Sequence, residues 1–343
     1  MRKLLLISIL AISAAACVKQ VAPFRSLASE ERDGYTVHLV TIGEEIPAYL
    51  LVPAGADAEH PGPAVLMLHD HGARFDIGKE KLVRPLEGSP EHIKRSARQW
   101  ADKNFEGVFL GDSLCSLGYV VLVPDALYWG GRSSEEAQRW SRLSFLEDSE
   151  PGLEHRSDTI RALKDIVYEG QRDVYGRCVS ERGEEWAEVI LEDDLAALEW
   201  LQALPFVDAG RVASFGFSMG AHRSWFLAAN TDRLRCAVAQ NWMTSLAAAD
   251  TTSASSLSMS VRRLRRRMDI PEIAAQASPT PLFLIAGERD HLFPRDTVDR
   301  CFSLIQSLYE PNMLRTEFFD GEHECPKRVQ VMVADYLGEM LRR

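Results

Sequence analysis

The chain has 343 residues, of which 46% are hydrophobic and 26% are charged, and its formal net charge is −11. This composition is typical of a soluble globular protein with a large hydrophobic core. The acidic balance argues against nucleic acid as a partner, because phosphate backbones repel a negatively charged protein.

The first 17 residues are expected to be a targeting signal rather than part of the fold. A basic start precedes an apolar run from Leu4 to Ile12, which is too short to span a bilayer. The sequence AAAC at 14–17 resembles the lipobox of bacterial lipoproteins, whose cysteine is lipidated and becomes the first mature residue. We therefore expect secretion across the bacterial inner membrane, a lipid anchor on Cys17 at the cell envelope (periplasm or outer membrane), and a polar tether over residues 18–33. The alternative is plain secretion after cleavage at an Ala-x-Ala site.

Short apolar runs beyond this segment predict a largely parallel sheet. Tyr35–Val40 and Ile46–Val52 suit an opening hairpin. Continuous apolar runs follow that suit strands buried on both faces: residues 64–68, 119–123, 212–215, 236–239 and 281–286. Helical patterns lie between or after these runs, chiefly at 183–204, 294–309 and 326–343. This alternation predicts one α/β domain over residues 34–343, with helices on both faces of a mostly parallel sheet.

Residues 131–185 do not follow this alternation. The segment is polar and charged, and one helix is expected in it at Ser134–Leu146. We interpret it as an insertion over the active-site end of the sheet, where it forms the wall of a pocket. The alternative is a surface excursion without a role in the site.

The pentapeptide Gly216-Phe217-Ser218-Met219-Gly220 matches the pattern G-x-S-x-G. It follows a predicted buried strand and precedes a predicted helix, which is the context of a nucleophile elbow. In such a turn the two glycines remove side chains that would collide with the neighbouring strand and helix. Ser218 is therefore the expected nucleophile.

A serine needs a base to take its proton, and the base needs a carboxylate partner. In this context the partners follow the serine in the order acid, then histidine. His222 lies one helical turn after Ser218 and is interpreted as a packing residue, and His291 is interpreted as a loop residue. His323 lies between an apolar run and the last helix, so it is the expected base.

Asp290 is the expected acid, because it follows the buried run that ends at Ala286 after a short turn. Its carboxylate would orient the imidazole of His323 and stabilise the charged ring. Other carboxylates are interpreted as solvated side chains of loops or of a helix surface: Glu288, Asp320, Glu322, Glu324, Asp193 and Asp194.

An oxyanion that develops on the substrate needs two backbone N–H donors. The first is expected from Met219, directly after the nucleophile, and the second from His71 in the loop after the early central strand. His69 and His71 lie at a strand end without a further ligand at fixed spacing, and the cysteines form no CxxC pair. We therefore expect neither a metal ion nor another cofactor.

At these residues the chain resembles the α/β-hydrolase superfamily over roughly residues 35–341. Four motifs come in the order that this fold requires: HDHG at 69–72, GFSMG at 216–220, GERD at 287–290 and GEHE at 321–324. The longer stretches LHDHGARFDIGKEKLVRP, GYVVLVPDALYWGGR and DGEHECP are similar to a bacterial branch of acetyl-xylan-esterase-like and dienelactone-hydrolase-like proteins. The resemblance implies an α/β-hydrolase fold and a serine esterase with Ser218, Asp290 and His323 as its triad. Dienelactone hydrolases carry a cysteine as the nucleophile, whereas this chain has a serine.

Four residues just after the predicted strand 119–123 are candidates for the substrate pocket: Asp125, Tyr128, Trp129 and Arg132. Trp129 is expected either to stack on a sugar ring or to wedge the insertion against the domain. The arginine-rich sequence RRLRRR at 262–267 is expected to pair with acids or to face solvent. A less favoured interpretation is that it holds an acidic substrate such as a uronate.

The sequence thus predicts a lipid-anchored serine esterase that deacylates a carbohydrate or a related small ester through an acyl-enzyme. Two alternatives stay open: a serine peptidase of the prolyl-oligopeptidase type, and a non-catalytic binding lipoprotein on the same fold. The acyl group, the alcohol and the oligomeric state do not follow from the sequence.

Overall fold

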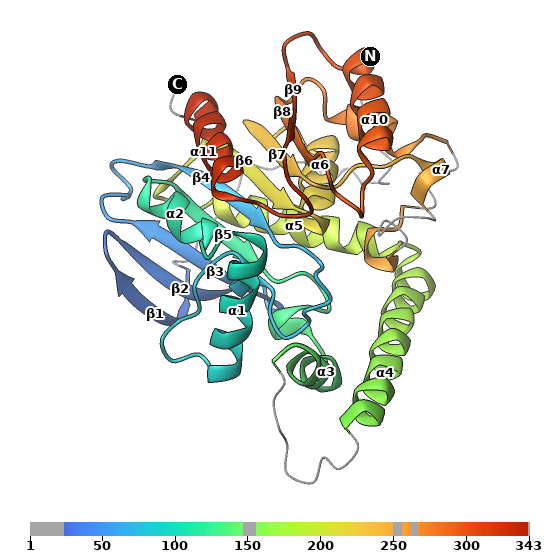
Figure 1. Cartoon of the computed structure of the whole chain (residues 1–343). Coiled ribbons are helices and arrows are strands. Elements are labelled where there is room, and N and C mark those ends of the chain that lie inside the picture. The colour runs from blue at the N-terminus through green and yellow to red at the C-terminus, as the bar shows by residue number, and fades with distance from the viewer. Residues whose placement is uncertain (1–23, 147–155, 250–255, 262–266, 342–343) are drawn as a thin grey trace.

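The computed structural model describes residues 24–146, 156–249, 256–261 and 267–341. A nine-stranded sheet runs through the whole domain (Figure 1). Its strands are β1 (Ser26–Arg32), β2 (Tyr35–Ile42), β3 (Ile46–Pro53), β4 (Gly62–Leu68), β5 (Val120–Pro124), β6 (Val207–Phe217), β7 (Cys236–Gln240), β8 (Leu282–Gly287) and β9 (Leu314–Phe319).

The strands lie in the order β1-β2-β3-β5-β4-β6-β7-β8-β9. The pairs β1–β2, β2–β3 and β3–β5 are antiparallel. Every other pair is parallel, from β5 through β4 to β9. The predicted α/β fold with a mostly parallel sheet and an opening hairpin is confirmed, because the continuous apolar runs are strands covered on both sides.

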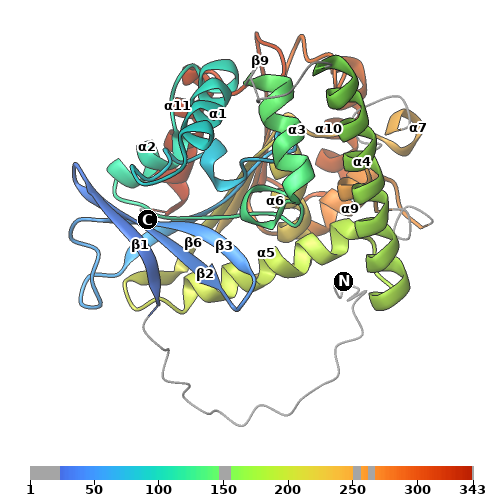
Figure 2. The ribbon, with the colours of Figure 1, turned by 90° about the horizontal axis from the view of Figure 1, so that it is seen from below.

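Helices cover both faces of this sheet. Those described are α1 (Glu91–Asn104), α2 (Leu110–Ser116), α3 (Glu135–Phe145), α4 (Arg156–Arg177), α5 (Trp186–Gln202), α6 (Met219–Asn230), α7 (Leu246–Ala249), α9 (Ile270–Ala274), α10 (Arg295–Leu308) and α11 (Lys327–Leu341). Figure 2 shows α1, α2 and α11 on one side of the sheet and α5 and α6 on the other.

Two hydrophobic clusters fill the space between the sheet and its helices. Leu66 and Leu68 of β4 belong to the cluster beneath α5 and α6. Val65 and Met67 belong to the cluster beneath α1, α2 and α11. Successive side chains of a strand point to opposite faces, so an uninterrupted apolar run such as that of β4 serves both cores.

Part of the segment predicted as a tether belongs to the folded domain. Within the predicted tether 18–33, Ser26–Arg32 forms β1 and pairs with β2 along the edge of the sheet. Phe24 packs edge-on against Trp200 and Phe206 of the domain. Strand β1 is largely exposed and rich in charged residues, as suits a strand at the edge of a sheet. It therefore lacks the alternation of apolar and polar residues from which a strand is predicted.

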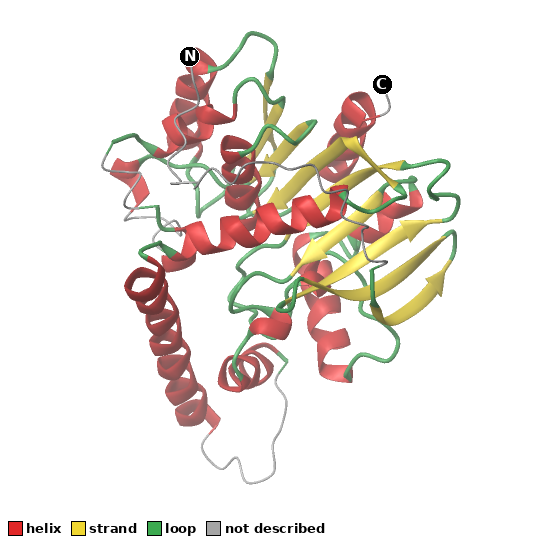
Figure 3. Cartoon of the chain, turned by 180° about the vertical axis from the view of Figure 1, so that it is seen from behind, coloured by secondary structure: helices red, strands yellow, loops and turns green. Residues whose placement is uncertain are grey.

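The described part of the insertion contains the helices α3 and α4, whereas one helix was expected. Helix α3 lies where a helix was expected, and its N-cap is Ser134, whose side chain accepts from the Ala137 N–H. Helix α4 was not anticipated and stands beside the domain, as Figure 3 shows from behind. Only a narrow stripe of α4 is buried, with Leu163, Val167 and Val174 among its members, and its many charged residues hide that stripe in the sequence.

A buried ion pair joins the two helices on one face of the sheet. Arg223 of α6 donates to both carboxylate oxygens of Asp194 of α5, at 3.0 and 2.6 Å. The two side chains are 3% and 1% exposed, so the expectation that Asp194 is a surface charge was wrong. Such a pair is costly to break on one side only, because the remaining charge stays buried without its partner.

Replacing Asp194 with alanine is expected to lower the free energy of unfolding by about 3–5 kcal/mol, because Arg223 is left buried and unpaired. Urea unfolding followed by circular dichroism measures this loss. Asp208→Ala is the matched control, since Asp208 forms a partly exposed pair with Arg211, and its cost should stay below about 1 kcal/mol. Equal losses in the two variants would contradict the role of the buried pair.

Candidate active site

The turn between β6 and α6 holds Ser218 in a strained backbone conformation. Its φ is 56° and its ψ is −122°, a region that residues with a side chain rarely adopt. The Ser218 N–H donates to the carbonyl of Gln240 at the end of β7, at 2.8 Å. The Ser218 carbonyl accepts from the Ala221 N–H at 2.8 Å, which starts α6. The neighbouring strand and the helix together hold the turn.

Two glycines allow this turn to sit close to its neighbours. A Cβ at Gly216 would lie 1.8 Å from the carbonyl oxygen of Gly220. A Cβ at Gly220 would lie 1.8 Å from the carbonyl oxygen of Leu68, at the end of β4. Any larger residue at either position would therefore push α6 away from the strand ends.

Ser218, His323 and Asp290 form one chain of hydrogen bonds. The Ser218 Oγ lies 2.8 Å from His323 Nε2, and His323 Nδ1 lies 2.7 Å from Asp290 Oδ2. Because Nδ1 faces a carboxylate, it carries the proton, and Nε2 is left to accept from the serine hydroxyl. Asp290 lies in the turn after β8, and His323 in the loop between β9 and α11.

The turn after β8 fixes the carboxylate of Asp290. Its Oδ1 accepts from the N–H groups of Leu292 and Phe293, at 2.8 and 3.2 Å, which leaves Oδ2 for His323. The Asp290 side chain is 1% exposed. Among the competing carboxylates, Glu288 pairs with Arg295 and Asp320 with Arg289, both at the surface.

Two aromatic rings hold the imidazole of His323. The ring centroid of Phe293 lies 5.8 Å away in a stacked arrangement, and that of Phe217 lies 5.1 Å away. The His323 side chain is 19% exposed, so one edge of it still reaches solvent. The base is thus fixed in orientation but accessible to a substrate.

The loop after β4 lies beside the turn of Ser218, because Leu68 pairs in register with Gly216. Its backbone turns at Gly72 and Ala73, which have φ values of 53° and 52°. The carbonyl of His71 accepts from Trp129 Nε1 at 2.8 Å. Burial, aided by the charge of Lys81, lowers the pKa of His71 to about 3, so this ring is neutral at neutral pH.

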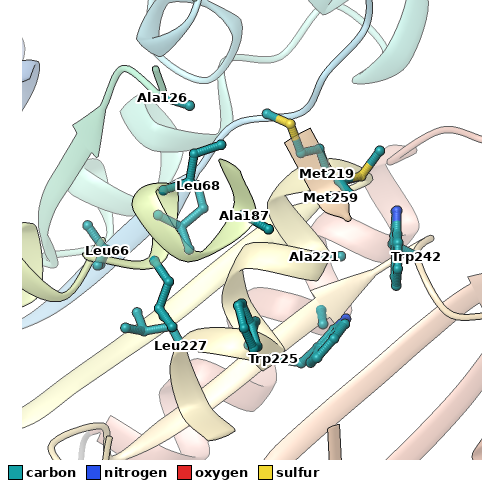
Figure 4. Close-up of a cluster of buried hydrophobic side chains, with 14 of the residues drawn as sticks. Leu66, Leu68, Ala126, Ala187, Met219, Ala221, Trp225, Leu227, Trp242 and Met259 are labelled. Carbon is teal, nitrogen blue, oxygen red and sulfur yellow. The ribbon is translucent and has the colours of Figure 1, made fainter. Parts of the chain in front are cut away.

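Met219 begins α6, and the first N–H groups of a helix have no partner within that helix. Its side chain is buried in the hydrophobic cluster that also holds Met259 and Trp225 (Figure 4). Any contribution of Met219 to the binding of a substrate oxygen therefore comes from its amide.

The model of the dienelactone hydrolase family matches residues 103–308. The chain belongs to this family. A Bacillus subtilis (strain 168) protein provisionally named hydrolase YtaP is 26% identical over 291 residues, which cover 83% of this chain and 80% of that protein.

Solved structures with the same fold are more distant in sequence from this dienelactone hydrolase family member. A Bacteroides fragilis protein provisionally named an acetyl xylan esterase has a TM-score of 0.60 and 15% identity, over 86% of this chain and 69% of its own. A glucuronoyl esterase from Solibacter usitatus has a TM-score of 0.57 and 13% identity, over 96% of this chain and 88% of its own. At such identities these likenesses establish the fold, and the family establishes the chain as a hydrolase.

The residues expected to line the substrate pocket serve this hydrolase mainly as framework. Trp129 is fully buried and Tyr128 is 6% exposed, so Trp129 is the wedge rather than a platform for a sugar ring. Asp125 is buried and accepts from Lys79 Nζ at 2.8 Å. Arg132 pairs with Asp193 at 2.6 Å. Arg132 thus ties the insertion to α5, whereas Asp125 and Trp129 tie the segment after β5 to residues that follow β4.

Tyr128 and Arg132 also line a cleft of about 710 Å³ beside α4. Other described residues around it include Ser134, Arg172 and Asp173. Ser218, Asp290 and His323 are not among its lining residues, so the cleft is separate from the site of the hydrogen-bonded chain.

His222 and His291 lie apart from the hydrogen-bonded chain. His222 is buried, with its ring centroid 4.7 Å from that of Trp225 and 4.6 Å from that of Trp242, and His291 is exposed. Within the described parts of the chain, no group of histidine, cysteine and carboxylate side chains has the arrangement of a metal site. The same residues include no helix long and apolar enough to cross a membrane. Cys17 and residues 262–266 lie outside the described residues.

Sequence reasoning missed the polar end of β7. Gln240 accepts from the Ser218 N–H through its carbonyl and donates from Nε2 to the Glu324 carbonyl at 2.7 Å. Asn241 Nδ2 donates to the Glu322 carbonyl at 3.0 Å. These two amides thus hold the loop on both sides of His323. A glutamine and an asparagine directly after a fully apolar run are the signal that was present in the sequence.

A methyl group at Gly216 is expected to displace the Gly220 carbonyl and, with it, Ser218. Because a misplacement of about 1 Å can cost on the order of 100-fold in rate, Gly216→Ala should slow fluorophosphonate labelling of Ser218 by at least about that factor. Gly176→Ala is the control, since a Cβ at Gly176 in α4 meets open space. Labelling rates that are alike in the two variants would rule out this steric requirement.

Proposed function

We propose that this protein is a serine carboxylic-ester hydrolase that works through an acyl-enzyme. The observation that carries the proposal is the hydrogen-bonded chain Ser218–His323–Asp290, at a strained turn between a buried strand and a helix. Membership of the dienelactone hydrolase family supports hydrolysis as the type of reaction. Serine as the nucleophile and a carboxylic ester as the substrate are the proposed refinements.

In the proposed mechanism, Ser218 Oγ attacks the ester carbonyl while His323 Nε2 accepts the serine proton. Asp290 stays ionised, keeps the proton of His323 on Nδ1 and stabilises the imidazolium. The N–H groups of Met219 and His71 bind the oxygen that becomes negative in the tetrahedral intermediate. His323 then gives its proton to the departing alcohol, and water releases the acid by the same steps.

Exchanging the triad residues should separate this mechanism from a binding role. Ser218→Ala is expected to abolish hydrolysis of p-nitrophenyl acetate, and Asp290→Asn to lower kcat by roughly 10⁴-fold, because an amide no longer fixes the tautomer of His323. Glu288→Gln should retain activity, since Glu288 is an exposed neighbour of the triad that pairs with Arg295. Full activity of Ser218→Ala would contradict the mechanism.

We propose acetylated carbohydrate, or a related small ester, as the substrate. The proposal rests on the sequence resemblance to acetyl-xylan-esterase-like proteins, and the solved structure so named has the same fold. Trp129, the residue with an expected alternative of stacking on a sugar ring, is fully buried, so the proposal rests on the resemblance. The lipid anchor on Cys17 and the envelope location stay predictions.

Acetate release from a panel of acetylated polysaccharides is the measurement that tests the substrate class. We expect release from at least one acetylated glycan, slower cleavage of a uronate methyl ester, and none of a proline-containing peptide amide. Ser218→Ala should release no acetate and is the control for spontaneous hydrolysis. Preferential cleavage of the peptide amide would favour a peptidase instead.

A further inference from the structure

Two side-chain nitrogen atoms contact the carbonyl oxygen of the peptide that joins Asp70 to His71. Its oxygen accepts from Lys81 Nζ at 2.7 Å and lies 2.9 Å from His69 Nδ1. Burial lowers the pKa of His69 well below its usual range, so its ring is neutral. The Ala126 N–H donates to His69 Nε2 at 3.0 Å, which leaves the ring proton on Nδ1. The Asp70 carbonyl therefore has two donors, one of them an ammonium group.

This carbonyl belongs to the same peptide group as the N–H of His71. A trans peptide is planar, and its C=O and N–H point in opposite directions. Two donors that fix the Asp70 carbonyl on the buried side therefore fix the direction of the His71 N–H on the other side. The loop lies next to the turn of Ser218, because β4 and β6 are paired up to Leu68 and Gly216.

Lys81 is buried, and its ammonium group contacts the loop of His71. Its side chain is 0% exposed, and Nζ also donates to the carbonyl of His71 at 2.9 Å and lies 3.4 Å from Asp70 Oδ2. The ammonium thus bridges two successive carbonyls. An ionised donor forms a hydrogen bond roughly twice as strong as a neutral one, and a dry surrounding strengthens it further.

We propose that Lys81 is a positioning residue for the oxyanion hole: its ammonium holds the Asp70–His71 peptide so that the His71 N–H faces the oxygen of an ester bound at Ser218. The inference rests on the proposed esterase function and deepens it. Lys81 does not touch the substrate. It acts through the peptide group, whose N–H it also makes a better donor by drawing electron density toward the carbonyl oxygen.

The test compares two buried lysines that lie two residues apart. Lys81→Met keeps the length and the apolar stem but removes the ammonium. Lys79→Met is the matched control, because Lys79 is also buried and ion-paired, with Asp125 at 2.8 Å and Glu80 at 2.9 Å, whereas the hydrogen bonds to the carbonyls of Asp70 and His71 come from Lys81. Both variants should lose thermal stability, so stability does not distinguish them.

The distinguishing readouts are the rate of fluorophosphonate labelling of Ser218 and the kinetics on p-nitrophenyl acetate, both corrected for the folded fraction. Lys81→Met should label about 10- to 100-fold more slowly than the wild type, a part of the roughly 100- to 1000-fold loss for a missing oxyanion donor. The loss should appear in kcat, with KM within about threefold, because the interaction is made in the transition state. Lys79→Met should label within about threefold of the wild type.

Lys81→Gln serves as a second variant, since it retains a neutral N–H donor on a polar side chain that is one bond shorter. It should lose less of the labelling rate than Lys81→Met. If the wild type is labelled and both Lys81 variants react like Lys79→Met, the positioning role is overturned and the proposed esterase function stands. A wild-type protein that is neither labelled nor hydrolyses the ester overturns both.

Discussion

The contact between the ends of β4 and β6 and the start of α6 is the constraint on which the site depends. The Leu68 carbonyl, the turn of Ser218 and the backbone of Gly220 meet at a distance that leaves no room for a single Cβ. That closeness places the loop of His71 next to the turn that holds Ser218 and Met219. It also explains why a serine tolerates a positive φ there, since the packing around it allows few other arrangements.

The segment from Asp70 to Lys81, which follows β4, contains several buried charged side chains. Lys79 and Lys81 are buried together with Asp70, Arg74 and Asp76, and each ion costs several kcal/mol to remove from water. Apolar side chains of similar size would fill the same space with comparable stability. Charged groups differ from apolar ones in that their hydrogen bonds orient the groups that they contact. The segment is therefore better explained by the need to orient backbone groups than by the need to stabilise the fold.

Much of the fold followed from the sequence because buried parallel strands leave an unmistakable pattern of short apolar runs. The elements that were missed lack that pattern: β1 is an exposed, charged edge, and α4 buries only a narrow stripe. The residues of the site were predicted because each follows the end of a strand. The ends of parallel strands lie at one edge of the sheet, so these residues meet there. Asp194 was misjudged and Gln240 was overlooked for one reason. Their roles depend on partners far away in sequence, Arg223 and Glu324, which no local pattern reveals.

The packing of Phe24 fixes the place where the N-terminal segment meets the domain. Phe24 packs against Phe206, directly before β6, whereas Ser218 follows the last residue of that strand. Val207 pairs with Gly62 and Gly216 pairs with Leu68, so the two points are separated by about the length of β4, roughly 20 Å. From Cys17 to Phe24 the chain spans at most about 25 Å even when fully extended. The predicted lipid on Cys17 would therefore attach the domain to the membrane at the end of β6 that lies away from Ser218.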